Sequence, residues 1–195
     1  MKTRNDFVSN SSSSSYIVIV DNGEPCCMLP ESVKKSMWRY QVPNKDYGCK
    51  EFGWQEEAYS TFADKLNWCG IILLDLYAAC RRAELKGGVK GKKACKIDAH
   101  YNEYREKFFL WKTMLEKVCE EKFGLKIYID LEWLTTHGGD ELDDCAYIST
   151  SGCYIDHQSD IFEEPANGKM FASEEALYNF LAYEDSYIQC GNDNG

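Results

Sequence analysis

The stretch FADKLNWCGIILLDLYAAC, residues 62–80, decides the fold because its apolar residues follow one regular spacing. Together with the preceding tyrosine, the apolar residues recur at alternating steps of three and four: Tyr59, Phe62, Leu66, Cys69, Leu73, Leu76 and Cys80. This period places them on one face of an α-helix. Ile72, Leu74 and Tyr77 lie off that face. The sequence therefore predicts a helix that is buried on more than one side.

A second helix is predicted from the same spacing further along the chain. Its apolar positions are Tyr101, Tyr104, Phe108, Trp111, Leu115 and Val118. Gly124 follows them, and glycine is the residue that most often ends a helix. Two such helices bury their apolar faces most simply by packing as an antiparallel hairpin. Leu73 and Trp111 are then predicted to be core residues.

Short β-prone segments surround this pair of helices. Strands are predicted in SYIVIVD (15–21), LKIYIDLEWL (125–134) and SYIQC (186–190), with two more in CAYISTSGCYIDH (145–157). Further helices are predicted over residues 30–40 and after Ser173, a good N-cap residue. Because strands and helices do not alternate, we predict an α+β fold: a small, mostly antiparallel sheet packed on a long antiparallel helical hairpin. Residues 1–15 are predicted to be a flexible Ser-rich leader, and residues 16–195 a single α+β domain.

The composition of the chain indicates the cellular compartment of the protein. The first ten residues are followed by serines instead of the apolar run of a secretory signal. The most apolar segment is interrupted by Asp75 and is too short to cross a bilayer. The ten cysteines include no CxxC spacing, which argues against a zinc ribbon or a thioredoxin-type site. We expect a cytoplasmic protein with reduced thiols and no membrane partner.

Charge is distributed unevenly along the chain. From Glu132 to the end there are fourteen acidic residues and one basic residue, Lys169, whereas the preceding part carries a net charge of +3. Such a segment repels phosphate backbones and suits a protein partner with a basic surface. The residues predicted to meet this partner are Asp140, Glu141, Asp143, Asp144, Glu163 and Glu164. Direct nucleic-acid binding is therefore not expected, except at one lysine-rich loop.

That loop, LKGGVKGKKACKID (85–98), lies between the two predicted helices. Its lysines at positions Lys86, Lys90, Lys92 and Lys93 form a candidate phosphate-binding set, because glycine-rich backbone can wrap a phosphate. The loop lacks the GxxxxGK[ST] spacing and does not follow a strand. The alternative is a solvated connector.

A candidate site for a divalent metal combines His137, Asp140, Asp144 and His157. Imidazole and carboxylate groups are suitable ligands for hard or borderline cations. The segment has no HxH, HExxH or EF-hand spacing, and its alternative interpretation is a solvated acidic loop. No other cofactor is predicted.

A cysteine–histidine pair is the weak candidate for catalysis. Cys153 and His157 would lie on the same face of one strand. Their Cα atoms should be about 13 Å apart, because a strand rises by roughly 3.3 Å per residue. Cys145 would lie opposite His157 if residues 150–152 form a three-residue hairpin loop. A half-buried cross-strand pair without catalytic function is the commoner outcome of that geometry.

The segment FVSNSSSSSYIV (7–18) resembles an N-terminal segment of uncharacterised bacterial and bacteriophage proteins, in which Phe-Val-x-Asn precedes a serine run and a strand. EFGWQ (51–55), YIDHQS (154–159) and FLAYEDSYIQCGNDN (180–194) resemble segments of a subset of them. The resemblance implies a phage or mobile-element origin and no established activity. We expect a non-enzymatic accessory protein, for example an inhibitor of a host nucleic-acid-handling or defence factor. The alternative is a small-ligand protein, either a metal-dependent hydrolase or a nucleotide or phosphate binder.

Overall fold

The computed structural model of the chain has an α+β architecture in which a small sheet and a long helical hairpin enclose one core. The structure describes residues 3–10, 13–36, 38–44, 46–48, 51–52, 57–87, 94–131, 154–155 and 165–190.

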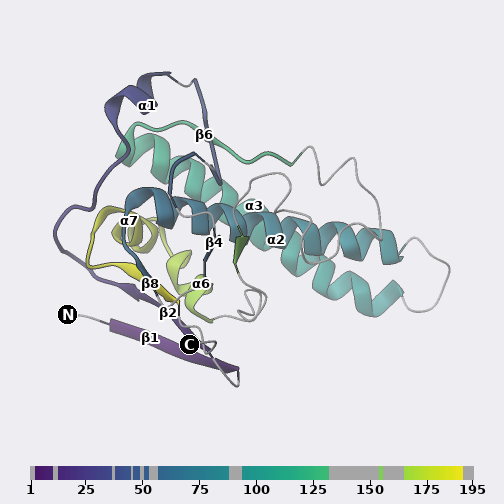
Figure 1. Ribbon diagram of the computed structural model, residues 1–195. Helices are drawn as coiled ribbons and strands as arrows, with labels where there is room; N and C mark the ends of the chain where they lie inside the picture. Colours follow the sequence, from purple (N-terminus) through teal and green to yellow (C-terminus); the bar gives the residue numbers. More distant parts are fainter. Residues whose placement is uncertain are drawn as a thin grey trace.

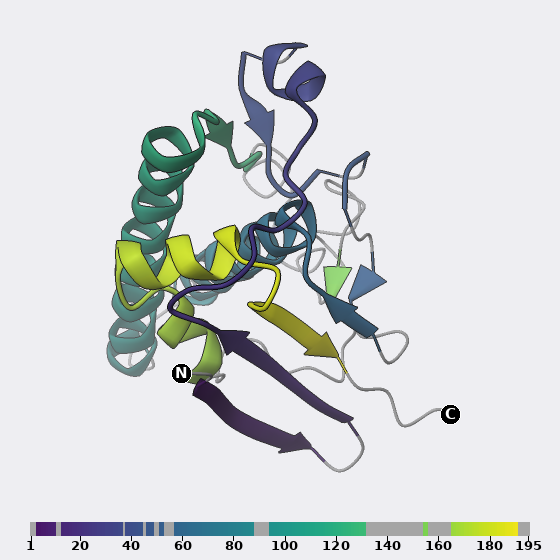
Figure 2. The same cartoon turned by 90° about the vertical axis from the view of Figure 1, so that its left-hand side faces the viewer.

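The main sheet is antiparallel, as Figure 2 shows. It contains β1 (Thr3–Asn10), β2 (Ser13–Ile19), β8 (Tyr187–Cys190) and β5 (Glu57–Tyr59), in the order β1-β2-β8-β5. Two shorter pairs are parallel: β3 (Tyr40–Gln41) with β6 (Ile127–Tyr128), and β4 (Glu51–Phe52) with β7 (Tyr154–Ile155). The predicted fold class, with a mostly antiparallel sheet, is confirmed.

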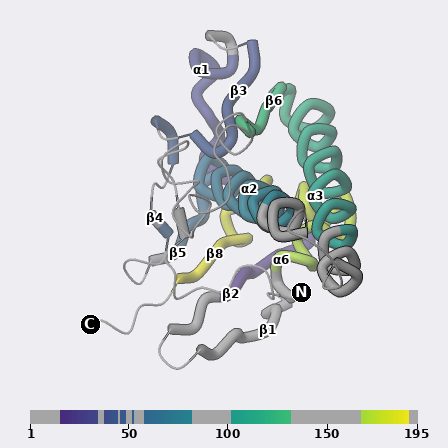
Figure 3. Tube along the Cα trace, turned by 90° about the vertical axis from the view of Figure 1, so that its right-hand side faces the viewer, coloured from purple at the N-terminus to yellow at the C-terminus, as the bar shows by residue number. Residues whose placement is uncertain are grey.

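The described helices are α1 (Glu31–Ser36), α2 (Phe62–Gly87), α3 (Ala94–Phe123), α6 (Pro165–Met170) and α7 (Glu174–Ala182). Helices α2 and α3 pack side by side as the predicted hairpin (Figure 1). Figure 3 shows α1 and β3 on one side of α2, and strands β2 and β8 of the main sheet on the other. Helix α2 is therefore enclosed from opposite directions.

The apolar stripe of α2 is buried along its whole length. Phe62, Leu66, Cys69 and Leu73 have no exposed surface, and the rest of the stripe is also buried. Every residue from 65 to 76 is buried, including those off the stripe. The prediction that this helix is buried on more than one side is confirmed.

Helix α3 contributes a narrower apolar face. Phe108, Leu115 and Val118 are buried, while Trp111 lies half-buried at the margin and stacks on Phe171 with ring centroids 4.6 Å apart. The helix ends where predicted, because Gly124 adopts a φ of +63° that other residues rarely reach.

Helix α7 begins as its sequence predicts. The side chain of Ser173 accepts a hydrogen bond of 3.0 Å from the N–H of Ala176, which satisfies one of the unpaired donors of the first turn. Leu177, Phe180 and Leu181 are fully buried, so this helix also faces the core.

The chain differs from the sequence-based expectation in three places. The helix expected over residues 30–40 ends at Ser36, because the backbone N–H of Tyr40 donates to Lys126 O and joins β3 to β6. The strand expected over residues 125–134 is limited to β6 within the described part. The expected flexible leader instead contains β1 and the first residues of β2. Serine is compatible with a strand here because the hydrogen bonds between paired strands join backbone groups.

Helix α2 tolerates a close backbone neighbour only because it carries Gly70. A Cβ atom at this position would lie 2.5 Å from Val42 Cγ1 and 2.7 Å from the Pro43 backbone nitrogen. Both distances are shorter than real Cβ contacts allow. The glycine therefore sets how closely residues 42–43 approach the helix.

Replacing Leu73 by alanine should lower the free energy of unfolding by roughly 2–5 kcal/mol, because the side chain is fully buried and its loss leaves a cavity. Urea denaturation of the variant measures the change. The matched control is Leu110→Ala, since Leu110 is 59% exposed and its truncation should cost less than about 0.5 kcal/mol. Equal losses for the two variants would contradict the packing described here.

Replacing Gly70 by alanine should lower the free energy of unfolding by about 1–3 kcal/mol, because the new methyl group overlaps Val42 and Pro43. Gly168→Ala is the control: its Cβ would meet no atom within 4 Å, so that variant should be neutral or slightly stabilised. Thermal denaturation of both variants compares them. A Gly70→Ala protein as stable as Gly168→Ala would show that the close approach is absent in solution.

Candidate functional site

Most of the functional residues predicted from the sequence lie outside the described residues. This applies to the acidic partner-binding set, the metal set, the Cys145–His157 pair and three of the four lysines: His137, Asp140, Glu141, Asp143, Asp144, Cys145, His157, Glu163, Glu164, Lys90, Lys92 and Lys93. These assignments stay predictions.

Two described segments border these predicted sites. Lys86 lies in the last turn of α2, where the backbone is helical. Strand β7 precedes His157 by two residues and pairs in parallel with β4. Neither segment decides between the candidate ligands.

Most of the cysteines whose side chains the structure describes lie in the core. Cys26, Cys27, Cys69, Cys80, Cys119 and Cys190 are in the thiol form, and all of these except Cys27 are buried, as expected of small core residues. Within the described part of the chain, no three His, Cys, Asp or Glu side chains gather as a metal site. No described helix has the length and apolar character needed to span a membrane.

The most unusual polar group of the described structure is Lys65, near the start of α2. Its side chain has no exposed surface. The Nζ atom donates hydrogen bonds of 2.7 Å to Tyr183 O and 3.0 Å to Ser186 O. A lysine is almost never fully buried unless it is paired, so these two carbonyl groups account for its position.

The carbonyl groups that receive Lys65 belong to the turn between α7 and β8. Other hydrogen bonds hold this turn and the end of α7 against residues 20–26. The N–H of Val20 donates to Ser186 Oγ at 3.0 Å, and the N–H of Glu184 donates to Glu24 O at 2.8 Å. The N–H of Cys26 donates to Ala182 O at 2.9 Å. Lys65 therefore connects the helical hairpin directly to residues 183–186. Through the backbone contacts of that turn and of the end of α7, it also connects the hairpin to residues 20–26.

Burial changes the protonation of this amine. Desolvation lowers the pKa of Lys65 to about 8, and the negative charges that Cys26, Cys69, Asp64 and Glu184 can carry oppose the shift. The Nζ atom also lies 5.8 Å from the centroid of the Phe180 ring, whose face attracts a cation. A neutral amine still has two N–H groups, which match the two carbonyl acceptors. Deprotonation therefore keeps both hydrogen bonds and removes the cost of a buried charge.

This arrangement has a structural use and not a chemical one. The Lys65 amine is enclosed, so no substrate reaches it as a nucleophile or base. Lys65 is not among the functional residues predicted from the sequence, although one signal for its burial is present there. A helix that is apolar on more than one side leaves little solvent-facing surface for a lysine between Phe62 and Leu66.

A second buried polar group, Asn67, fixes the loop before the hairpin. Its Oδ1 atom accepts from the N–H of Asn44 at 2.8 Å, and its Nδ2 atom donates to Tyr47 O at 2.7 Å. Gly48 follows with a φ of +89°, and a Cβ there would lie 2.6 Å from Asn67 Nδ2. Buried amides of this kind hold irregular backbone in one conformation.

In comparisons with known proteins, the chain matches no protein-family model, no curated protein and no solved structure.

The pH dependence of stability should report on Lys65. Its pKa is about 8 in the fold and near 10.5 in the unfolded chain, so the unfolded state binds more protons between these values. Lys65 alone therefore contributes up to roughly 3 kcal/mol to the free energy of unfolding, a contribution that grows with pH across this window. The thiols of Cys69 and Cys119, whose pKa burial raises, contribute with the opposite sign. The free energy of unfolding of the wild type minus that of Lys65→Met should therefore rise between pH 7 and pH 10.5, as measured by urea denaturation in a reducing buffer.

Lys122→Met is the control for that experiment, because Lys122 is exposed in the last turn of α3. It should keep the wild-type pH dependence. If Lys65→Met also keeps it, the amine is solvated and the burial described here is incorrect.

Proposed function

We propose that the protein is a non-enzymatic binding protein whose acidic C-terminal third engages a basic surface on another protein. One observation carries the proposal: the fourteen acidic residues and single basic residue from Glu132 onward. Carboxylates at this density repel one another, and a partner with basic side chains relieves that repulsion. Association driven in this way is fast and sensitive to salt.

The described part of this third supports the proposal. Glu175, Glu184 and Asp185 are exposed, at the first turn of α7 and in the turn that follows the helix. Glu174 lies beside them in sequence and pairs with Lys117 at 2.7 Å. These carboxylates are at the surface, where a partner can reach them.

The chemistry of the partner follows from the charge. A phosphate backbone is repelled by this surface, whereas a protein that binds nucleic acid carries a complementary basic one. Such proteins include nucleic-acid-handling and defence factors, which suits the phage or mobile-element origin implied by the N-terminal resemblance. The protein would then occupy the basic surface and compete with nucleic acid for it.

The proposal is tested by affinity capture from a bacterial lysate at 50 and 300 mM salt, with retained proteins identified by mass spectrometry. A variant with Asp140, Glu141, Asp143 and Asp144 changed to the corresponding amides should lose basic proteins that the wild type retains at low salt. With a purified retained protein, the variant should slow association more than it speeds dissociation, because steering acts on encounter. Salt should weaken the wild-type complex steeply.

The matched control removes the same number of charges from α3. Glu103, Glu106, Glu120 and Glu121 are exposed there, and their change to glutamine should leave the capture unchanged. Equal losses for the two variants would mean that net charge alone matters and would contradict a site in the C-terminal third. A set of retained proteins that neither variant nor salt alters would contradict it as well.

A further inference from the structure

The half-buried side chain of Tyr183 lies where α7 ends and the turn to β8 begins. The backbone of this residue is held from several directions. Its carbonyl oxygen accepts hydrogen bonds from Lys65 Nζ at 2.7 Å and from the N–H of Ser186 at 3.0 Å. Tyr183 also forms a β-bridge with Pro25, and its ring meets the Tyr178 ring in a T-shaped contact with centroids 6.0 Å apart. A ring held in this way loses little conformational freedom when a partner binds it.

Two acidic segments meet beside this ring. Glu184 and Asp185 follow Tyr183 directly, whereas Glu24 belongs to the segment after β2. The N–H of Glu184 donates to Glu24 O at 2.8 Å, which joins the two segments. All three acidic residues are exposed. A Cβ atom on Gly23 would lie 3.3 Å from Tyr183 Cβ and 3.1 Å from Asp185 Oδ2. The fold therefore brings acidic residues from two distant segments close to one aromatic ring.

The exposed ring of Trp38 already has a cation from its own chain, whereas the Tyr183 ring has none. The guanidinium carbon of Arg39 lies 5.4 Å from the centroid of the Trp38 ring. Among the residues that the structure describes, no lysine or arginine takes this position at Tyr183. The two adjoining segments, 20–30 and 172–190, contain no lysine or arginine. An aromatic ring with carboxylates beside it therefore suits a cation that another molecule supplies.

Arginine fits this arrangement better than lysine. Its planar guanidinium group stacks on an aromatic face and still donates hydrogen bonds to carboxylates at its edge. The ammonium group of lysine is a strongly hydrated point charge, so it gains less from the ring. The carboxylates alone would attract both side chains, but the ring favours the guanidinium group.

We infer that Tyr183 anchors an arginine side chain of the basic partner, with the carboxylates of Glu24 and Glu184 as acceptors. This inference rests on the proposed function and deepens it, because it names the side chain that the partner contributes and the ring that receives it. It also extends the binding surface beyond the C-terminal third, since Glu24 precedes the helical hairpin in the sequence.

The experiment is a titration of the full chain with hexaarginine at 50 mM salt, followed by calorimetry and by NMR of the peptide. Side-chain protons of an arginine that stacks on a ring should move upfield on binding to the wild type, because the ring current shields them. Tyr183→Leu should lose this shift and bind at least fivefold more weakly. It keeps the backbone hydrogen bonds, so it should stay folded by circular dichroism. Tyr183→Phe keeps the ring and should behave as the wild type. Hexalysine should bind the wild type and Tyr183→Leu equally.

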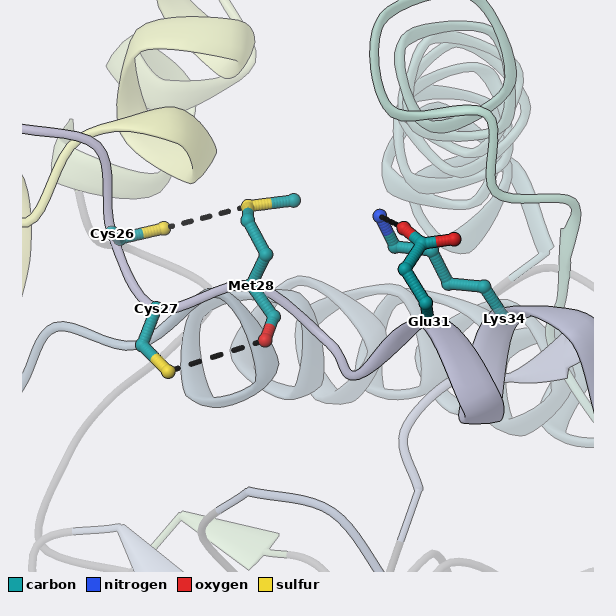
Figure 4. Close-up of polar contacts among 5 residues, drawn as sticks. All are labelled: Cys26, Cys27, Met28, Glu31 and Lys34. Atoms are coloured by element: carbon teal, nitrogen blue, oxygen red, sulfur yellow. Dashed lines mark hydrogen bonds and ion pairs between the residues drawn. The ribbon is translucent and has the colours of Figure 1, made fainter.

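Trp38→Leu is the matched control, because it removes a ring that is 85% exposed and already has Arg39 beside it. The preceding helix α1 adds Lys34, which pairs with Glu31 at 3.2 Å (Figure 4). This variant should bind hexaarginine as the wild type does.

The four-amide variant of the capture experiment separates the two proposals. If Tyr183→Leu binds and shifts hexaarginine as the wild type does, the inference is overturned, while a loss in the four-amide variant still supports the proposed function. The inference is also overturned if the wild type does not bind hexaarginine, or if Tyr183→Leu and Trp38→Leu weaken binding equally. Capture from the lysate then decides the proposed function by itself.

Discussion

The enclosed amine of Lys65 is the constraint on which the arrangement of the hairpin and the sheet depends. A charged or neutral amine without exposed surface must find acceptors, and the carbonyl groups of Tyr183 and Ser186 provide them. Those groups belong to the turn that leads into β8. Because β8 is a central strand between β2 and β5, the position of this turn also sets the position of the sheet against α2.

The long helices and the fold class could be predicted from the sequence, because their signals are local and repeated. The apolar period of α2 extends over five turns, Gly124 ends α3, and Ser173 caps α7. The two-residue pairs β3–β6 and β4–β7 have no such signal. Hydrogen bonds between distant segments decide them, as when Tyr40 meets Lys126, and periodicity carries no information on that choice.

The candidate sites also differ in how far they could be predicted from the sequence. The excess of acidic residues is a property of composition and needs no coordinates, so the proposed partner surface follows from the sequence. The role of Lys65 does not follow from the sequence, because the carbonyl groups that accept its hydrogen bonds are more than a hundred residues away along the chain. This buried amine is held by acceptors that only folding brings close to it.

The most direct test of this account is the titration of Lys65 by heteronuclear NMR of lysine side chains labelled with ¹³C and ¹⁵N. One resonance should titrate with a pKa of about 8 and should be missing from the spectrum of Lys65→Met. The exposed lysines serve as internal references in the same spectra. If every lysine titrates near 10.5, Lys65 is solvated and does not join the hairpin to the turn before β8.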